Sequence, residues 1–438
     1  MSEPSAQPRR QRAGRGALTA ILLLTAGAQA ATAATPAYVP AHGAPVCRGV
    51  EGYAASFGGR RTFLLNPDAL QAVKARFDDP ALAPAREALM KRAEAALAGP
   101  VYSVVDKTKT PLSGDKHDYM SIGPYWWPDP DKPGGEPYVR HDGQFNPQRD
   151  TDVFDTSRLD KMSGGVEALG LAYYFTGDRR YADKAAQLLK VWFLDPATRM
   201  NPNAAFAQAV PGRNAGRAEG VLDTFRLQRV VEAIGLLAPS GAIKPADQKG
   251  LEAWFGDYVA WMQSSKTGQE EQAAENNHGI WFDYQITQYA LFSRHDEVAK
   301  GVVERFPAKR IDPQIEPDGK LPRELTRTRA LHYSVFALEA AGGVAELGRC
   351  LGADLWRYQS ADGRGLRRAI DFIAPYAGRE KEFPYPDLRP QETAEMFELL
   401  SRAAWAYDEP AYARAAALQA PANAAEDVNL RIPPYRPR

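Results

Sequence analysis

Two short stretches of this chain gather polar groups that can carry out acid–base chemistry. The first runs from Glu275 to Gln285 and reads ENNHGIWFDYQ, and the second runs from Arg323 to Ser334 and reads RELTRTRALHYS. Together they offer amides, an imidazole, guanidinium groups and a phenol. Paired amides beside a histidine are unusual in an otherwise apolar helical pattern, because buried amides are unfavourable unless they are hydrogen-bonded. Both stretches are therefore candidate functional segments.

The reaction that would use these groups together is β-elimination on a uronic acid polymer. The C5 proton of a uronate lies beside a carboxylate and is barely acidic while that carboxylate stays ionised. An amide and a cation at the carboxylate would stabilise the developing anion, and a base and an acid would move the two protons. The candidate catalytic residues are Asn277, His278, Arg327 and Tyr333, and a nearby Arg favours the phenolate form of a Tyr.

Each of these residues also has an ordinary structural explanation. Asn276 or Asn277 could cap a helix that begins at this point, and a single His is most often structural. Arg323, Arg327 and Arg329 alternate and could form a solvated basic surface. The combination of all these groups, rather than any one of them, favours a site.

The bulk composition excludes several classes of protein. The chain has 438 residues, of which 44% are hydrophobic, and 54 basic residues balance 54 acidic ones. Without a basic excess, we expect no nucleic acid partner. No cluster of His, Cys, Asp and Glu has the spacing of a metal site, so we expect neither a metal nor a cofactor.

Residues 1–34 read as a secretory signal peptide. Four Arg precede an apolar run that is too short to span a membrane, and small residues follow it. Removing this segment leaves 50 basic and 53 acidic residues, a net charge of −3. We expect a periplasmic or secreted protein with no membrane partner after cleavage. A polyanionic substrate would then have to be attracted by a local basic cleft.

The chain contains two cysteines, Cys47 and Cys350. Export to an oxidising compartment makes a disulfide between them possible, and two unpaired buried thiols are the alternative. The sequence leaves both open.

Helical periodicity dominates the chain. It starts near Pro67 and continues, with a break at residues 78–80, to Leu97. A helix–turn–helix pattern recurs near residues 171–186, 289–300 and 405–415, which is typical of stacked helical hairpins. Further helices are predicted at 218–237, 246–264, 277–292, 324–342, 365–375 and 391–405. The sequence thus predicts an all-α fold, an incomplete (α/α) toroid, with residues 35–438 as one domain.

Residues 103–150 interrupt this pattern. They are rich in Pro, Gly, Asp and aromatic residues, and long loops in compact domains are usually functional or disordered. The aromatic content argues against disorder. We therefore predict a long structured loop.

The two stretches resemble a known enzyme family. Asn-Asn-His-Gly-x-Trp-Phe-Asp followed by Glu-Leu-x-Arg-Thr-x-x-Leu-x-Tyr-Ser is similar to the alginate-lyase-type polysaccharide lyases, closest to polysaccharide lyase family 38 and more distantly family 5. The likeness extends to His117-Asp118-Tyr119-Met120 and to Pro124-Tyr125-Trp126-Trp127-Pro128, and covers roughly residues 110–400.

The resemblance implies an (α/α) toroid that cleaves uronate glycans, such as alginate or glucuronan, by metal-free elimination. It implies that Asn277 neutralises the substrate carboxylate and that His278 is the catalytic His. Tyr333 would be the acid, and also the base in syn elimination, with Arg327 beside it. The Arg–Tyr spacing of six is one shorter than in family 5, which favours family 38 and leaves Arg323 and Arg329 as alternative partners.

The resemblance also gives the aromatic loop a role. Tyr125, Trp126 and Trp127 could line the cleft and stack on sugar rings, although ordinary packing beneath a lid would explain each of them equally well. Further candidate substrate contacts are His117, Arg140, Gln208 and Arg213.

Two other functions compete with a lyase. A glycoside hydrolase on the same toroid would need two placed carboxylates, and it would leave the amides, His and Tyr without a purpose. The acids available to it are Asp118, Glu275, Asp283 and Glu324. A non-catalytic glycan-binding protein could use the aromatic loop as its platform, but binding alone does not require a His–Tyr–Arg group.

Overall fold

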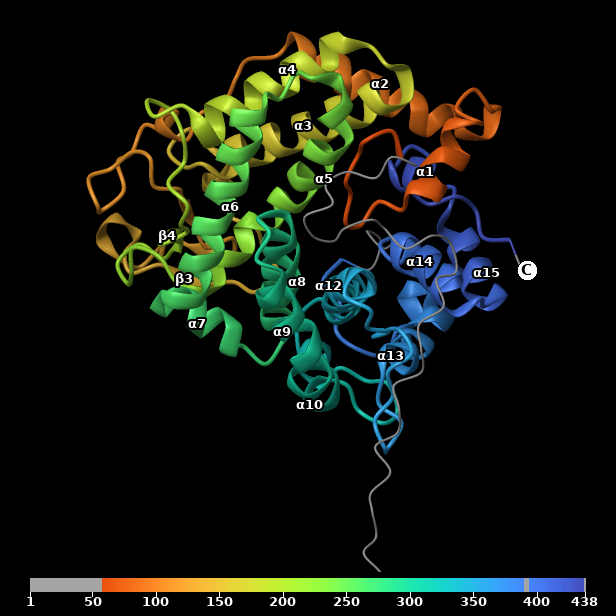
Figure 1. The fold of residues 1–438 in the computed structure, drawn as a ribbon. Coiled ribbons are helices and arrows are strands. Elements are labelled where there is room, and N and C mark those ends of the chain that lie inside the picture. Colours follow the sequence, from red (N-terminus) through yellow and green to blue (C-terminus); the bar gives the residue numbers. More distant parts are fainter. Residues whose placement is uncertain (1–56, 390–393, 437–438) are drawn as a thin grey trace, which may run out of the picture. The chain divides into compact units, whose positions relative to one another are not determined.

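Helices form where apolar residues recur with helical spacing. The computed structural model describes residues 57–389 and 394–436, and helices predominate in them, so the predicted all-α class is confirmed (Figure 1). The predicted signal peptide and Cys47 lie outside the described residues, and Cys350 is buried at the end of its helix. Helices α1 to α16 span Pro67–Lys74, Ala83–Ala98, Thr156–Thr176, Arg179–Leu189, Leu227–Leu237, Pro245–Ser264, Lys266–Ala273, Asn277–Phe292, Asp296–Phe306, Asp312–Gln314, Pro322–Leu325, Ala330–Cys350, Leu366–Ile373, Phe397–Tyr407, Pro410–Gln419 and Val428–Arg431.

Five helices form the inner wall of an incomplete toroid. The helices α3, α5, α8, α12 and α14 succeed one another, and each packs against the next. The helices α4, α9, α13 and α15 pack outside the inner helix that precedes them in the chain, and α6 packs against α8. The first helices, α1 and α2, contact α16, so the two ends of the helical array meet (Figure 1). This arrangement is the predicted (α/α) toroid of helical hairpins.

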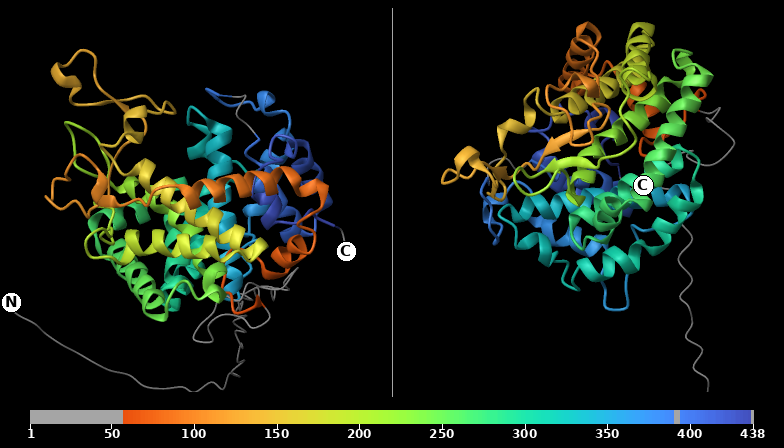
Figure 2. Two further views of the ribbon diagram at one scale, coloured as in Figure 1. Left: turned by 90° about the horizontal axis from the view of Figure 1, so that it is seen from above. Right: turned by 90° about the vertical axis from the view of Figure 1, so that its left-hand side faces the viewer.

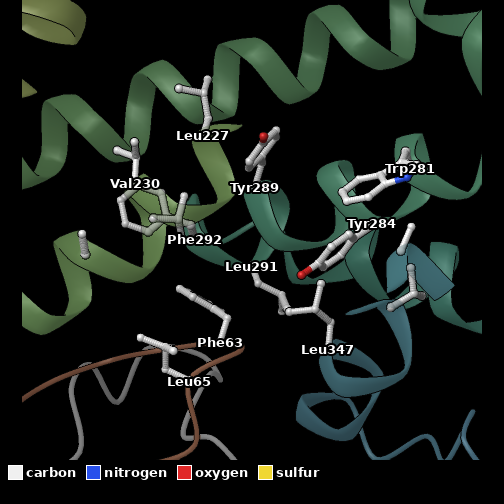
Figure 3. Packing of buried hydrophobic residues seen from close by; sticks show 14 of the residues in the cluster. Phe63, Leu65, Leu227, Val230, Trp281, Tyr284, Tyr289, Leu291, Phe292 and Leu347 are labelled. Atoms are coloured by element: carbon white, nitrogen blue, oxygen red, sulfur yellow. The ribbon is translucent and has the colours of Figure 1, made fainter. Parts of the chain in front are cut away.

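The helix α8 lies at the centre of the packing. Every residue of α8 except His278 is buried, as expected for a helix surrounded by other elements. Phe63 and Leu65 of the N-terminal segment pack near Leu291 of α8 (Figure 3). On α12, Gly343 allows close approach, because a Cβ there would lie 2.2 Å from the ring of Tyr284. Within the part of the chain that the structure describes, none of the helices could span a membrane.

The segment 103–150 is an ordered loop with short strands. Strand β1 (Met120–Ile122) pairs in parallel with β4 (Phe206–Ala209), and β2 (Trp126–Trp127) pairs antiparallel with β3 (Val139–Arg140). The loop projects from one face of the helical array (Figure 2). The pairing with β4 ties the loop to the segment that leads into α5.

The predicted helix 324–342 is wrong at its beginning. The chain forms α11, turns at residues 326–329, and starts α12 at Ala330. Here the backbone forms long-range hydrogen bonds in place of helical ones: the Ala330 N–H donates to the Pro386 carbonyl, and the Leu388 N–H donates to the Thr328 carbonyl. The predicted helix 218–237 begins as a 3₁₀ segment before α5, and α14 begins at Phe397 rather than at residue 391.

Candidate active site

The two adjacent amides at the start of α8 have different roles. Asn276 is the N-cap, because its Oδ1 accepts a hydrogen bond from the His278 N–H at 3.2 Å. Asn277 is only 1% exposed. Its backbone N–H and its Nδ2 donate to the Glu324 carboxylate at 2.6 and 2.7 Å. The Asn277 amide is therefore held in one orientation and is not used for capping.

Glu324 joins the two sequence stretches. It lies on α11 and is 2% exposed. Burial raises the pKa of its carboxyl, while the two N–H donors of Asn277 and the charges of Arg327 and His278 oppose that effect. Arg327 and His278 both act electrostatically on this one carboxylate, so the first turn of α8 and the turn after α11 form a single site.

His278 is bonded to a carboxylate from α7. Its Nδ1 lies 2.6 Å from Glu271 Oε1, and Glu271 is 1% exposed. Burial alone would lower the pKa of the imidazole, but the Glu271 charge and hydrogen bond outweigh burial and raise it. His278 therefore holds its proton to a higher pH than an ordinary histidine.

Replacing Glu271 with glutamine is expected to lower the pKa of His278, because the carboxylate that raises it is removed. The pKa of His278 is higher in the folded chain than in the unfolded chain, where it is about 6.5. The His278–Glu271 pair therefore stabilises the fold fully below about pH 6.5, and this stabilisation is lost as the pH rises through the folded pKa. An NMR titration of the His278 imidazole, assigned with His278→Gln, measures the shift. The melting temperature of E271Q should differ from that of wild type more in acid than in alkali. A difference in melting temperature that does not change with pH would contradict this account.

The turn after α11 places Arg327 against Tyr333. The guanidinium carbon of Arg327 lies 3.6 Å from the centroid of the Tyr333 ring. Its Nε and Nη2 donate to the Asp142 carboxylate of the loop at 3.1 and 2.8 Å. The structure therefore supports Arg327 as the guanidinium partner of Tyr333, whereas Arg329 bonds to Glu395.

The loop also contributes a phenol to this site. The hydroxyls of Tyr125 and Tyr333 lie 2.6 Å apart, and Tyr333 is 5% exposed. Burial raises the pKa of Tyr333 well above its ordinary value, the Tyr125 hydroxyl adds to this, and Arg327 opposes it. Tyr333 is therefore a protonated phenol at neutral pH in this structure.

Two guanidinium groups lie over Trp126 at the loop, and the guanidinium of Arg140, its strand partner, donates to Asp142 at 2.6 Å. The guanidinium carbons of Arg213 and Arg217 lie 5.2 and 6.0 Å from its ring, and Arg140 pairs with Trp126 across the two strands. Arg140 is half exposed. These groups make a local basic surface with an aromatic face, in a chain that has no net positive charge.

Gln208 is buried between two polar partners. It is 5% exposed, its Oε1 accepts from Arg217 at 2.7 Å, and its Nε2 donates to Asp223 at 2.9 Å. Its φ of +48° is strained for a residue other than glycine. Both ends of the Gln208 amide are engaged by protein groups, and its contact holds Arg217 in place.

His117 and Trp127 also have protein partners. The Nδ1 of His117 lies 2.6 Å from the Arg199 carbonyl, which ties the start of the loop to the segment after α4. The Trp127 Nε1–H donates to the Gln144 carbonyl at 3.0 Å. Neither contact involves the catalytic candidates, so these two residues are not brought to Tyr333 in the way Tyr125 is.

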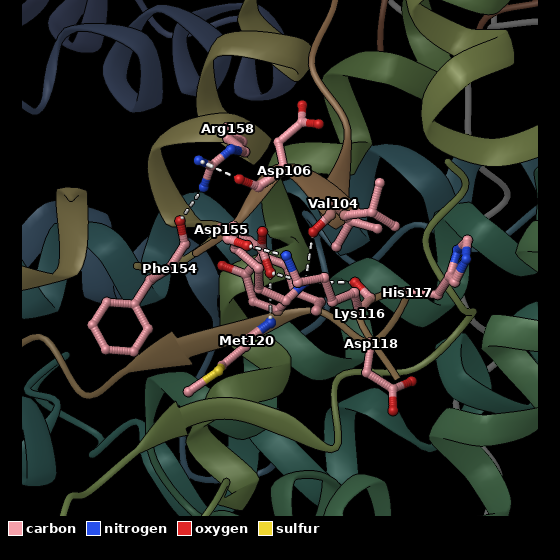
Figure 4. A network of polar contacts seen from close by, with 12 residues as sticks. Val104, Asp106, Lys116, His117, Asp118, Met120, Phe154, Asp155 and Arg158 are labelled. Atoms are coloured by element: carbon pink, nitrogen blue, oxygen red, sulfur yellow. Dashed lines mark hydrogen bonds and ion pairs between the residues drawn. The ribbon is translucent and has the colours of Figure 1, made fainter. Parts of the chain in front are cut away.

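A buried ion pair anchors the base of the loop (Figure 4). Lys107 Nζ lies 2.9 Å from Asp155, with both side chains fully buried, and it donates to the Val104 and Lys116 carbonyls at 2.6 and 2.7 Å. Burial lowers the pKa of Lys107, and it raises the pKa of Asp155 to about 6 although Lys107 opposes this. The pair holds the loop against the N-terminus of α3.

Substituting Lys107 with methionine should lower the free energy of unfolding by about 3–5 kcal/mol, because it leaves the buried Asp155 charge without its ion-pair partner. Denaturant unfolding measures this value. The exposed neighbour Lys109→Met is the matched control and should behave like wild type. The double variant K107M/D155N should lose less than K107M alone, and an equal or larger loss would show that the pair is not the cause.

Sequence reasoning did not identify three partners of the candidate site residues. These are Glu271 at His278, Asp142 at Arg327, and Arg217 beside Trp126. Asp142 precedes Gly143, whose φ of +76° and close approach to Thr328 mark a tight turn. A turn signal of His-Asp-Gly type was therefore present, but nothing in the sequence connects it with Arg327, which lies 185 positions away.

The carboxylates that a hydrolase would need are each bound to another group. The pairs are Asp118 with Asn201 and Asn203, Glu275 with Arg323, Asp283 with Arg310, and Glu324 with Asn277. Asp283 is fully buried, which removes it from any substrate. Among the described residues, no group of three or more His, Cys, Asp or Glu side chains could hold a metal ion.

Comparison with known proteins shows the family of this chain. The sequence model of a family described as alginate lyase matches residues 103–383. A crystal structure described as an alginate lyase from Bacteroides ovatus is 42% identical over 85% of this chain and 99% of that chain, with a TM-score of 0.81. Alginate lyase A1-III from Sphingomonas species A1 is 18% identical over 74% of this chain and 88% of its own, with a TM-score of 0.41. No curated protein matches the sequence.

The matched span contains both sequence stretches and the loop that reaches Tyr333. The family match extends over more than half of this chain. The likeness to the Bacteroides ovatus structure covers nearly the full length of that structure. This chain belongs to the alginate lyase family and is a polysaccharide lyase.

Proposed function

We propose that this lyase cleaves uronate-containing glycans, either alginate and polymannuronate or glucuronan, by β-elimination without a metal. One observation carries the proposal: Glu324 links the Asn277 amide to the turn whose Arg327 covers the ring of Tyr333. In this proposal the Asn277 amide, the His278 imidazole and the Tyr333 phenol act together on one sugar acid. A related A1-III variant has been described in complex with a tetrasaccharide, which supports a glycan as the ligand.

In this proposal the substrate carboxylate binds to the Asn277 amide and the His278 imidazolium. Both groups stabilise the charge that develops on the carboxylate as the C5–H bond breaks. The C4–O4 bond then breaks, a C4–C5 double bond forms, and a proton is delivered to O4. Burial keeps Tyr333 protonated at rest. In a syn elimination Tyr333 first loses that proton beside Arg327, then accepts the C5 proton as a phenolate, and finally passes that same proton to O4.

We also propose that the basic surface at Trp126 binds neighbouring uronates. Arg140 and Arg213 are exposed there, and Arg217 is held by Gln208. Cations beside an aromatic ring suit an acidic sugar, since the ring can stack on the apolar face and the cations can pair with the carboxylate. The Arg327–Tyr333 spacing favours polysaccharide lyase family 38. Residues 1–34 favour export to the periplasm or the medium.

One assay tests the activity. The chain from residue 35 onward is incubated with alginate, polymannuronate, polyguluronate and glucuronan, and the ultraviolet absorbance of unsaturated uronate is followed. We expect absorbance with at least one polymer, and no loss of rate when a chelator is added. New reducing ends without absorbance would mean hydrolysis. Binding without new ends would mean a glycan-binding protein, and either result would overturn the proposal.

A further inference from the structure

The loop residue Asp142 forms a three-part contact with the catalytic turn. Its carboxylate accepts from Arg327 Nε and Nη2 and from the Thr328 hydroxyl, the last at 3.0 Å. Both partners of the ion pair are only about one-fifth exposed. The two N–H donors lie along one edge of the guanidinium, which is the bidentate arrangement that fixes an arginine in a plane.

We propose that Asp142 is a positioning residue that holds the Arg327 guanidinium over the Tyr333 ring. Tyr333 then has its guanidinium partner in place for turnover only when the loop contacts the turn at residues 326–329. The inference rests on the proposed function and assigns a task to a residue that does not itself touch substrate. A free guanidinium prefers water to a single ring face. With one edge bound to Asp142, Arg327 stays 3.6 Å from the ring centroid.

The backbone of the loop is shaped for this contact. Gly143 has a φ of +76°, and a Cβ on it would lie 2.8 Å from the Thr328 hydroxyl. A larger residue would push the loop away from the turn. The left-handed φ and the narrow gap both require glycine directly after Asp142, so the close approach is built into the chain.

The same loop delivers a second group to Tyr333. The hydroxyl of Tyr125 lies 2.6 Å from the Tyr333 hydroxyl, while Asp142 acts from the ring face through Arg327. Docking of one segment therefore sets both the hydrogen bond and the nearest positive charge of the phenol. Burial alone would raise the pKa of Asp142, but Arg327 outweighs it and lowers the pKa to about 2. The carboxylate stays charged at every pH at which the enzyme could work.

The test is Asp142→Asn in the full mature chain. We expect kcat to fall on the order of 10²-fold, as for a displaced catalytic group, with a much smaller change in KM. Asp142→Glu keeps the charge and should recover part of the rate. Asp131→Asn removes an exposed carboxylate from the same loop and should match wild type.

A double-mutant cycle separates positioning from a general structural role. In an Arg327→Gln background, Asp142→Asn should cause a much smaller further loss than in wild type, because the Asp142–Arg327 pair is already gone and only the contacts of Asp142 with Thr328 and Arg140 remain to be lost. Additive losses, or an unchanged kcat in D142N, would overturn the proposal. Amide hydrogen exchange over residues 120–146 gives a readout that needs no substrate, and it should quicken in D142N. If wild type yields no unsaturated product, the proposed function fails while the exchange result still tests loop docking.

Discussion

Replacing Tyr333 with phenylalanine should remove nearly all turnover while leaving the fold intact. The phenol is the group best placed to pass a proton to the departing oxygen, and loss of one general acid or base lowers a rate by roughly 10²–10⁴-fold. The loss should lie at the upper end, since Tyr333 is proposed to move both protons in a syn elimination. The measurement is kcat on the best polymer from the substrate panel.

The structural cost of this change is small. Only one hydroxyl contact, that with Tyr125, is removed, and the ring remains buried against Arg327. The melting temperature of Y333F should therefore stay near that of wild type. Tyr376→Phe, in the 3₁₀ turn that follows α13, is the matched control and should keep full activity. Normal turnover in Y333F would exclude Tyr333 as the acid.

The second large effect is expected from Asn277→Ala. If the amide stabilises the developing charge on the carboxylate, its loss should reduce kcat by roughly 10²–10³-fold, the range seen for one oxyanion donor. The variant also removes one of the two Asn277 donors to Glu324, and leaving a buried acceptor short of a donor costs about 1–3 kcal/mol. Both kcat and the free energy of unfolding should fall.

A comparison with Glu324→Gln separates these two effects. That variant keeps the Asn277 amide but weakens its anchor, since a glutamine offers only one oxygen to two N–H donors. It should lose stability as N277A does and lose less activity. If N277A kept its rate while its stability fell, Asn277 would be a structural residue of the α8 turn and not a catalytic one.

Local sequence pattern predicted most of the helical architecture. The helix at 277–292 was placed at its observed bounds, because a polar Asn pair directly precedes a long apolar run. The break at 78–80 between α1 and α2 carries its own signal in Asp-Asp-Pro. The interruption at 326–329 was not predicted, since that turn is held by Asp142 and by residues 386–388, far away in sequence.

The candidate site, like the helices, could be predicted from the sequence only in part. Asn277, His278, Arg327 and Tyr333 could be nominated because each lies in a dense polar stretch. Their partners could not, because Glu271 and Asp142 sit in segments with no pattern that links them to the stretches. Tyr125 was predicted only as a residue that could line the cleft, and the structure shows a contact that was not predicted, between its hydroxyl and that of Tyr333. A contact of this kind depends on how the loop folds back over α12, which residue order alone does not encode.

The meeting of the first and last helices has a practical consequence for protein production. The family match ends at residue 383 and starts at residue 103, so an expression boundary drawn there would omit α1, α2 and α14 to α16. Those helices cover α3 and α12 and join to each other. A chain cut to the matched span would therefore leave apolar helix faces bare to water, and recombinant work on this lyase needs both flanks.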